Sequence, residues 1–351
     1  MVFEENNLGS VVLNIQNVTK IIRGTHQVAL SDITLQVGLG RVLGLVGDNR
    51  VSRATLFRLI LGLQSPDSGS LNFFEQDYCV GVGKIASKIG FVPENIELTK
   101  NLNGIKYLKL ISQLSGVEEQ VAVARIAKYS EIFHFGDHLG TSIRKLSRSQ
   151  ARCLVFIGAL VHDPALLLLE EPVKDFDLGM RKVVRRLIRD LSAEGKTIII
   201  ATDDLPFLEQ VTGDLAIFVD GHIAFQGPLA SIKNIKDTPT VSIRFAGSVD
   251  RFESELRIHV NRGILSYRFA TDTCYIYFDP EMFLSERLRL LLDIIENSEI
   301  VLLDLRPSIV DLGDAVDGVV SNFRETRVSK LLGLHEPGPQ RSLDHSPVDG
   351  S

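Results

Sequence analysis

The sequence has few cysteines, no long apolar run and no excess of positive charge, and each absence excludes a class of protein. Its three cysteines, Cys79, Cys153 and Cys274, show neither the spacing of a metal site nor that of a disulfide framework. No apolar run approaches the ~20 residues that cross a bilayer, and no cationic-then-apolar signal segment opens the chain. The net charge of −6 argues against a dedicated nucleic-acid binder. We therefore expect a protein of a reducing cytosol that binds no nucleic acid and reaches a membrane only through a partner.

Two hydrophobicity patterns divide the chain. Residues from about 11 to 40 alternate apolar and polar side chains, which predicts strands of an antiparallel sheet. Short apolar runs then alternate with helical segments ("RVLGLVG", "ALLLLE" and "TIIIAT"), which is typical of parallel strands buried on both faces. Further on, the order strand, helix, two strands, helix, strand predicts a small split βαβ unit.

These patterns give an expected domain organisation. The chain is long enough for two domains with their own cores, and "NIKDTP" has the composition of a linker between them. The last residues, "HEPGPQRSLDHSPVDGS", have the composition of a disordered tail. We expect an N-terminal extension (1–10), an α/β domain (11–235) with a helical subdomain (about 97–150), an α+β domain (236–322) and a disordered tail (323–351).

The segment "LGLVGDNRVSRATLFRLILGL" has the layout of a phosphate-binding loop, in which a buried strand is followed by a glycine turn and a helix. In the pattern G-x-x-x-x-G-K-[ST], Ser52 stands where the second glycine is expected. Arg53 replaces the lysine, and Ala54 replaces the Ser or Thr. The candidate phosphate-binding residues are Gly47, Asp48, Asn49, Arg50, Val51, Ser52, Arg53, Ala54 and Thr55.

The substitutions weaken the chemistry of this loop. Backbone N–H groups at a helix N-terminus bind phosphate, and glycine lets that backbone approach closely, whereas Val51 is β-branched. Arg53 keeps a positive charge, but its planar guanidinium does not fit the cradle of a compact ammonium. Ala54 lacks the hydroxyl that would ligate Mg²⁺. Three interpretations remain open: a damaged ATP site, a site for another ligand, and a turn without a ligand.

Several further segments match one family in order and spacing. They are "DSGSLNF", "KIGFVPENIELTKNLNG", "LSRSQARCLVFIGALVHDPALLLLEEPVKDFD" and "TIIIATDDLPFLEQVTGDLAIFVDGHIAFQG". With the loop they make residues 11–235 resemble the nucleotide-binding domain of an ABC transporter. The region that ends in "LLDLRPSIVDLGDAV" resembles the small domain appended to ATPase subunits of many bacterial exporters. The resemblance implies a P-loop NTPase-like α/β fold with a helical subdomain and a C-terminal α+β (split βαβ) domain.

The resemblance also implies roles for carboxylates outside the loop. Glu170 stands at the Walker B aspartate and Glu94 at the Gln-loop position, which makes both implied Mg²⁺ contacts. Glu171 stands at the general base that orients the attacking water. Asp203 replaces the switch histidine, so a carboxylate is expected to face and repel the γ-phosphate.

Two clusters farther along the chain complete the candidates. The signature "LSRSQ" retains Ser147 and Gln150, but Arg148 and Ser149 occupy its glycine positions. Side chains there would obstruct the γ-phosphate across a head-to-tail dimer. The basic segment "RKVVRRLIRD" has helical apolar spacing, which favours a solvated helix face over an anion site.

The sequence therefore predicts a degenerate ABC transporter ATP-binding subunit, a structural or regulatory pseudo-ATPase that binds ATP and Mg²⁺ weakly or not at all. Its expected partners are the transmembrane subunits of an exporter, on the inner face of the cell membrane. It is expected to form a homodimer, or a heterodimer with another ABC ATPase subunit. The alternatives are a slow Mg-ATPase that uses Glu171, with Arg53 in place of the lysine, and a soluble adaptor without a transporter.

Overall fold

An antiparallel sheet forms one side of the N-terminal domain in the computed structural model. Its order is β2-β1-β4-β5, and β1 pairs with both β2 and β4 in antiparallel fashion. The strands are β1 (Val11–Ile21), β2 (Val28–Gly38), β4 (Ser68–Phe73) and β5 (Gln76–Asp77). The structure describes residues 11–22, 24, 27–47, 49–73, 76–77, 87–232, 241–260, 262–270, 273–279, 282–307 and 312–331. The candidate Asp48 and the expected extension 1–10 lie outside these ranges.

A six-stranded sheet carries the apolar runs of the sequence. Its order is β10-β9-β3-β8-β7-β6, with every neighbouring pair parallel except β10 with β9. Successive residues of these strands belong to two separate cores, so both faces are buried, as their continuous apolar character predicts. The strands are β3 (Val42–Gly47), β6 (Ile89–Val92), β7 (Leu166–Glu170), β8 (Thr197–Ala201), β9 (Asp214–Val219) and β10 (His222–Pro228).

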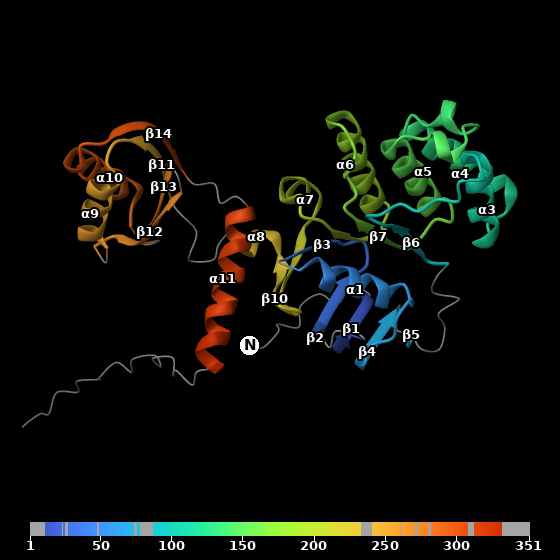
Figure 1. Cartoon of the computed structure of the whole chain (residues 1–351), viewed down its shortest axis with the longest axis horizontal. Helices are drawn as coiled ribbons and strands as arrows, with labels where there is room; N and C mark the ends of the chain where they lie inside the picture. The colour runs from blue at the N-terminus through green and yellow to red at the C-terminus, as the bar shows by residue number, and fades with distance from the viewer. Residues whose placement is uncertain are drawn as a thin grey trace, which may run out of the picture.

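Helices cover both faces of this sheet. Helix α1 (Arg50–Ile60) lies between the two sheets and contributes Leu56, Phe57 and Ile60 to the core there (Figure 1). Helices α5 (Arg148–Leu160), α6 (Leu178–Ala193) and α7 (Leu205–Val211) cover the other face. Helices α3 (Gly104–Leu114) and α4 (Glu119–Ile132) pack on α5 as a helical subdomain, joined by the short helices η2 (Gly136–His138) and η3 (Ile143–Lys145).

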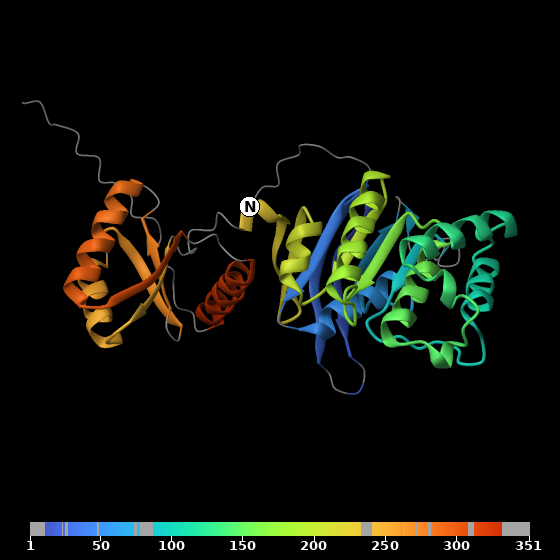
Figure 2. The same cartoon turned by 90° about the horizontal axis from the view of Figure 1, so that it is seen from above.

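The C-terminal unit has its own sheet and core. Its order is β12-β13-β11-β14, every neighbouring pair is antiparallel, and two helices lie on one face (Figure 2). The elements are β11 (Val241–Ala246), α9 (Val249–His259), β12 (Ile264–Ala270), β13 (Thr273–Phe278), α10 (Leu284–Ser298) and β14 (Val301–Pro307). This is the split βαβ order that the sequence predicts.

Helix α11 (Leu312–Leu331) follows the C-terminal unit but packs on the N-terminal domain, against β9, β10 and α7. It differs from the expected boundaries, which place 312–322 in the α+β domain and a disordered tail from 323. The physical reason is an apolar face at helical spacing that runs from Leu312 through Val316 and Val319 to Phe323 and joins the core. The short helix α8 (Leu229–Ile232) ends the first domain, and the other boundaries stay predictions.

Candidate functional site

The turn between β3 and α1 is held by contacts within the chain. Gly47 has a φ of 146°, and a Cβ added there would lie 2.0 Å from the carbonyl oxygen of Phe218. The neighbouring strand β9 therefore requires a glycine at this position, whatever the loop binds. Asn49 caps α1, because its side-chain oxygen accepts a hydrogen bond of 2.8 Å from the Val51 N–H. One of the amides that a phosphate would need is thus already bonded.

Arg53 points into the protein and does not project from the loop as a free cation. Only 3% of the residue is exposed. One guanidinium nitrogen, Nη1, donates to the carbonyl oxygens of Thr202 at 3.0 Å and Leu45 at 3.4 Å. The other, Nη2, forms an ion pair with Oδ1 of Asp203. The residue at the lysine position and the residue at the switch position therefore bind each other.

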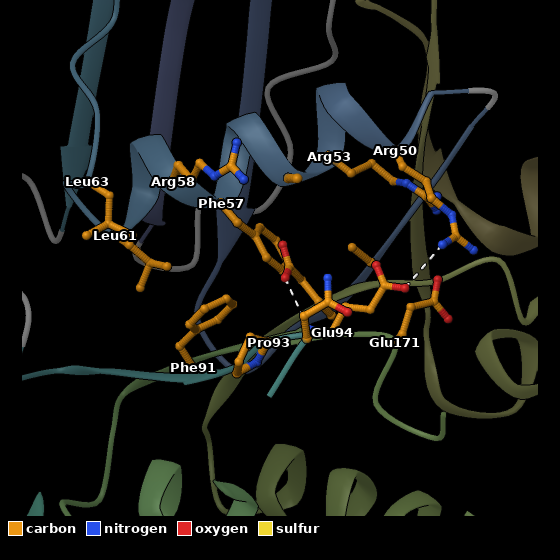
Figure 3. A pocket seen from close by; sticks show the side chains of 14 residues that line it. Arg50, Arg53, Phe57, Arg58, Leu61, Leu63, Phe91, Pro93, Glu94 and Glu171 are labelled. Atoms are coloured by element: carbon orange, nitrogen blue, oxygen red, sulfur yellow. Dashed lines mark hydrogen bonds and ion pairs between the residues drawn. The ribbon is translucent and has the colours of Figure 1, made fainter. Parts of the chain in front are cut away.

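Arg50 completes this arrangement from the first turn of α1. Its Nε and Nη2 donate to Oδ2 of Asp203 at 2.8 and 2.5 Å. Its Nη1 lies 3.2 Å from Oε1 of Glu94 (Figure 3). Partial burial opposes the ionisation of Asp203, but hydrogen bonds from Arg53 and Arg50 outweigh it and hold its pKa below the ordinary value. Asp203 is therefore a paired carboxylate, and its expected repulsion of a γ-phosphate stays a prediction.

The glutamates at the ends of β6 and β7 are also bonded internally. Glu94 Oε1 accepts from Lys174 Nζ at 2.8 Å, and this hydrogen bond, with the charges of Lys174 and Arg50, lowers the pKa of Glu94. Glu170 Oε2 accepts from the Glu94 N–H at 3.2 Å, while burial raises the pKa of Glu170. Among the residues that the structure describes, no group of three or more His, Cys, Asp or Glu side chains could hold a metal ion.

Glu171, at the general-base position, faces the segment after β8. Its Oε1 accepts from the Asp203 N–H and its Oε2 from the Thr202 hydroxyl, both at 2.9 Å. The residue has a φ of 44°, a left-handed conformation that non-glycine residues adopt at a cost. Its carboxylate is thus fixed by two hydrogen bonds at the mouth of the site.

A cleft of about 290 Å³ lies between α1 and the carboxyl ends of β6 and β7. The structure brings together there six of the residues that the sequence nominates, namely Arg50, Arg53, Ala54, Glu94, Glu170 and Glu171. Its apolar wall consists of Phe57, Phe91 and Pro93, which extend toward the cleft in Figure 3. The cleft lies at the position of the predicted site, but two of its cations are already paired: Arg50 with Glu94 and Asp203, and Arg53 with Asp203.

Ser147 and Gln150 do not line this cleft. They form a capping box at the start of α5: Ser147 Oγ accepts from the Gln150 N–H at 3.2 Å, and Gln150 Oε1 accepts from the Ser147 N–H at 2.9 Å. Gln150 Nε2 also lies 3.0 Å from Nε2 of His138. The two retained signature residues therefore have a structural role in this chain, independent of any ligand.

Sequence reasoning missed Arg152, which connects the parts of the site. It is 1% exposed, and its guanidinium donates to the carbonyl oxygens of Glu94 at 2.8 Å and Glu171 at 3.3 Å and lies 3.5 Å from Asp175 Oδ2. Burial lowers its pKa, although the nearby carboxylates oppose this shift. The signal was present, since one arginine precedes the long apolar run "CLVFIGAL".

The basic segment of α6 was only partly interpreted correctly. Arg181 forms an ion pair with Asp204, and Arg185 bonds to the side chain of Gln210. Arg189 donates to the Gln210 carbonyl oxygen at 2.7 Å. Three arginines of α6 therefore bind α7 and its N-cap residue Asp204, so this side of α6 is not simply a solvated face.

The comparisons with known proteins support the family resemblance. Residues 30–174 match the family model described as ABC transporter. The chain is 27% identical over 262 residues to the uncharacterized ABC transporter ATP-binding protein YhaQ of Bacillus subtilis, covering 74% of this chain and 84% of that one. It is 28% identical over 280 residues to the Nod factor export ATP-binding protein I of Rhizobium leguminosarum, covering 78% and 87%.

One solved structure supports the fold, and only the fold. It is a dimeric ATP-binding cassette in a post-hydrolysis state, bound to ADP and Pi, with a TM-score of 0.58 at 19% identity. The match covers 62% of this chain and 98% of that one. In the described part of the chain, no helix is long and apolar enough to cross a membrane. The predicted family resemblance and cassette fold are thus confirmed.

Proposed function

Because this chain carries an ABC transporter ATP-binding domain, we propose that it is a structural or regulatory pseudo-ATPase of a membrane export complex. ABC ATP-binding subunits pair with transmembrane subunits and form dimers. In the proposal, this chain is a folded cassette subunit with a structural or regulatory role. ATP is then bound and hydrolysed by another subunit of the assembly or not at all. The direction of transport rests on the resemblance and on the named Nod factor exporter.

One observation carries the proposal: the ion pair between the buried Arg53 and Asp203. To bind phosphate in the usual place, the loop must free Arg53, break the contacts of Arg50 with Asp203, and release the Val51 N–H from Asn49. A hydrogen bond to a charged group contributes about 1.5–3 kcal/mol. Even with strong non-additivity, these costs support an ATP affinity in the high micromolar range or weaker.

Magnesium meets a similar obstacle. Ala54 has no hydroxyl to offer, and the Glu94 carboxylate already neutralises Lys174 and Arg50. Glu170 lies beside Glu94, and burial raises its pKa. These residues do not fit a Mg-ATP site as they stand.

The proposed place of the subunit is at the inner membrane surface, bound to transmembrane subunits. By resemblance, the coupling surface runs from Glu94 through the helical subdomain to about Ser130. Arg152 supports such a role, because its hydrogen bonds tie the backbone of Glu94 to helix α5. A movement of the helical subdomain would therefore be transmitted to Glu94 without any nucleotide.

Calorimetric titration of the purified chain with Mg-ATP tests the proposal. The parent chain should bind no more tightly than in the high micromolar range. A variant with Arg50→Gly, Val51→Ala, Ser52→Gly, Arg53→Lys, Ala54→Thr and Asp203→His should bind at least about tenfold more tightly. The same variant without Asp203→His is the matched control, because it replaces both arginine partners of Asp203 but keeps Asp203 itself. Low-micromolar binding by the parent contradicts the proposal.

A slow Mg-ATPase is the second candidate, because Glu171 is retained and held by two hydrogen bonds at the mouth of the cleft. Turnover by the parent chain that disappears in Glu171→Gln, but not in the surface variant Asp190→Asn on α6, would favour this candidate. An adaptor without a transporter is distinguished by affinity purification, since it would recover no transmembrane subunit with the tagged chain.

A further inference from the structure

The sheet of the C-terminal unit has one face that its helices do not cover. Ile276 and Phe278 of β13 lie in the core with α9 and α10, so the alternate residues Tyr275 and Tyr277 point to the other face. Both tyrosines are partly exposed. Figures 1 and 2 show the two helices on the side turned away from α11. The face that carries the tyrosines is therefore turned toward α11.

The strand register places one row of side chains across this face. Arg268 of β12 lies opposite Tyr275 of β13, and its guanidinium carbon is 5.1 Å from the centre of the Tyr275 ring. Tyr275 lies opposite Ser242 of β11, and Ser242 lies opposite Arg306 of β14. The row thus has an aromatic ring inside it and an exposed arginine on each edge strand. We call the open face the surface formed by this row together with Tyr277, Arg244 and Asp304.

The charge of the open face is opposite to that of the helical side of the unit. The four strands contain three arginines and one aspartate, and the register places all four on the open face. Helices α9 and α10 together contain six carboxylate side chains and four arginines. Arg244 is exposed and has no ion-pair partner among the described residues. Arg306 pairs with Asp304 through its Nε at 2.8 Å, and its two remaining nitrogens can bind a second carboxylate.

We propose that the open face binds residues 332–351 of the same chain. These residues lie outside the described ranges and follow Leu331, the last residue of α11, which is the helix that the open face is turned toward. They contain three carboxylate side chains and one arginine, so their charge complements that of the face. They also contain three prolines, and proline-rich segments in the polyproline II conformation bind surfaces lined by aromatic side chains. Asp344 follows Leu331 by 13 residues, which span up to about 43 Å when extended.

The spacing of two aspartates in this segment fits the row. Arg268 and Arg306 stand on strands that are three inter-strand spacings apart, or about 14 Å at about 4.8 Å each. Asp344 and Asp349 are five residues apart, or about 16 Å at about 3.1 Å per residue of polyproline II. Because the two separations agree, both carboxylates can reach the two guanidinium groups at the same time. Pro347 then lies between them, over the aromatic ring of the row.

This contact would link the C-terminal unit to the first domain a second time. Helix α11 packs on β9, β10 and α7 of that domain. A segment that leaves α11 and binds the open face therefore restrains the unit relative to the first domain. The inference does not rest on the proposed loss of ATP binding, and either can fail without the other.

Competition within the full chain tests the inference. The probe is a fluorescently labelled peptide of residues 332–351, and fluorescence anisotropy measures its binding. In the parent, the chain's own segment has a high effective concentration at the face and should exclude the peptide. A full-length variant with Asp344→Lys and Asp349→Lys, the released variant, should bind the peptide at least about tenfold more tightly than the parent does. Equal binding by the two chains, or no binding by either, would overturn the inference.

Substitutions on the open face of the released variant show where the peptide binds. Tyr275→Ala should weaken binding at least about tenfold because it removes the ring, and Tyr275→Phe is its matched control because it keeps the ring. Arg306→Glu should weaken binding at least about tenfold. Arg289→Glu is the matched control for the charge: Arg289 is exposed on α10, on the helical side of the same unit, and its substitution should leave binding unchanged.

A charge exchange tests the predicted pairing. A peptide with Asp344→Arg or one with Asp349→Arg, whichever aspartate meets β14, should restore binding to the Arg306→Glu chain. Restoration by neither peptide, or a Tyr275→Ala chain that binds like the released variant, would overturn the inference. A single-stranded oligonucleotide that binds the face where the peptide does not would assign the face to nucleic acid and would also overturn it.

Discussion

The phosphate loop and helix α10 of the C-terminal unit differ in how their charged side chains are partnered. In the loop, Arg50 and Arg53 both bind Asp203, although a family motif marks the region as a ligand site. On α10, Arg289 and Glu296 have no ion-pair partner among the described residues, although no motif marks that helix. A motif thus gives the position of a site, whereas the partners of its side chains decide whether it can take a ligand.

The difference is also one of burial. The Arg53 guanidinium is withdrawn from water, so its charge needs Asp203 and the two carbonyl oxygens around it. The charges on α10 are exposed and hydrated, and they cost the monomer nothing. Substitutions of the loop charges should therefore change the stability of the chain, while substitutions of the exposed charges on α10 should leave it nearly unchanged.

Asp203→Asn should have the largest effect on stability. The substitution keeps the shape of the side chain but leaves Arg53 buried without its counter-charge, and we expect a loss of about 2 kcal/mol. This is below the usual cost of breaking a buried pair because Asp203 is 45% exposed and water can reach it. Urea unfolding followed by circular dichroism measures the change.

Asp190→Asn on α6 is the control for this substitution. Asp190 makes an exposed i,i+4 pair of 3.6 Å with Arg186 on the same helix, and removing its charge should cost no more than about 0.5 kcal/mol. Equal losses in the two variants would mean that the Asp203 pair is no stronger than a surface pair. The loop would then be open to a ligand after all.

Acid should remove the same contribution. The folded-state pKa of Asp203 lies below the ordinary value, so the stability from its ionisation is present above the unfolded pKa of about 3.9 and is lost as pH falls through the folded pKa. The stability difference between the parent and Asp203→Asn should stay constant from pH 7 to about pH 5 and shrink below about pH 4. A difference that shrinks between pH 7 and pH 5 would assign the contribution to another group.

Much of the fold could be predicted from the sequence, because buried parallel strands, helices and the split βαβ order leave periodic apolar patterns. The location of the site could also be predicted, since Glu94, Glu170 and Glu171 lie at or just after the carboxyl ends of neighbouring strands. The pairing of Arg53 with Asp203 could not. It joins residues 150 positions apart, and the local sequence around each residue indicates its place relative to a phosphate but not relative to the other residue.

Two further features could not be predicted from the sequence, for different physical reasons. Gly47 was interpreted as a phosphate-binding glycine, but its close approach to the Phe218 carbonyl oxygen appears only when β3 and β9 are paired. Helix α11 was divided between a domain and a tail, because the polar composition beyond residue 331 concealed the apolar spacing that ends at Phe323. In each case, a tertiary contact decided between interpretations that the local sequence leaves equal.

Arg50→Ala should have the smallest effect, and it separates the two arginines of the loop. The Arg50 side chain is 60% exposed, so its bonds to Asp203 and Glu94 compete with water, and we expect a loss under about 1 kcal/mol. Asp203 keeps Arg53 as a partner and Glu94 keeps Lys174, so no buried charge is left alone. Urea unfolding of the single variants and of Arg50→Ala combined with Asp203→Asn measures the coupling. If Arg50→Ala costs as much as Asp203→Asn, the exposed arginine and not the buried one holds the loop, and the contrast between buried and hydrated charges fails within this site.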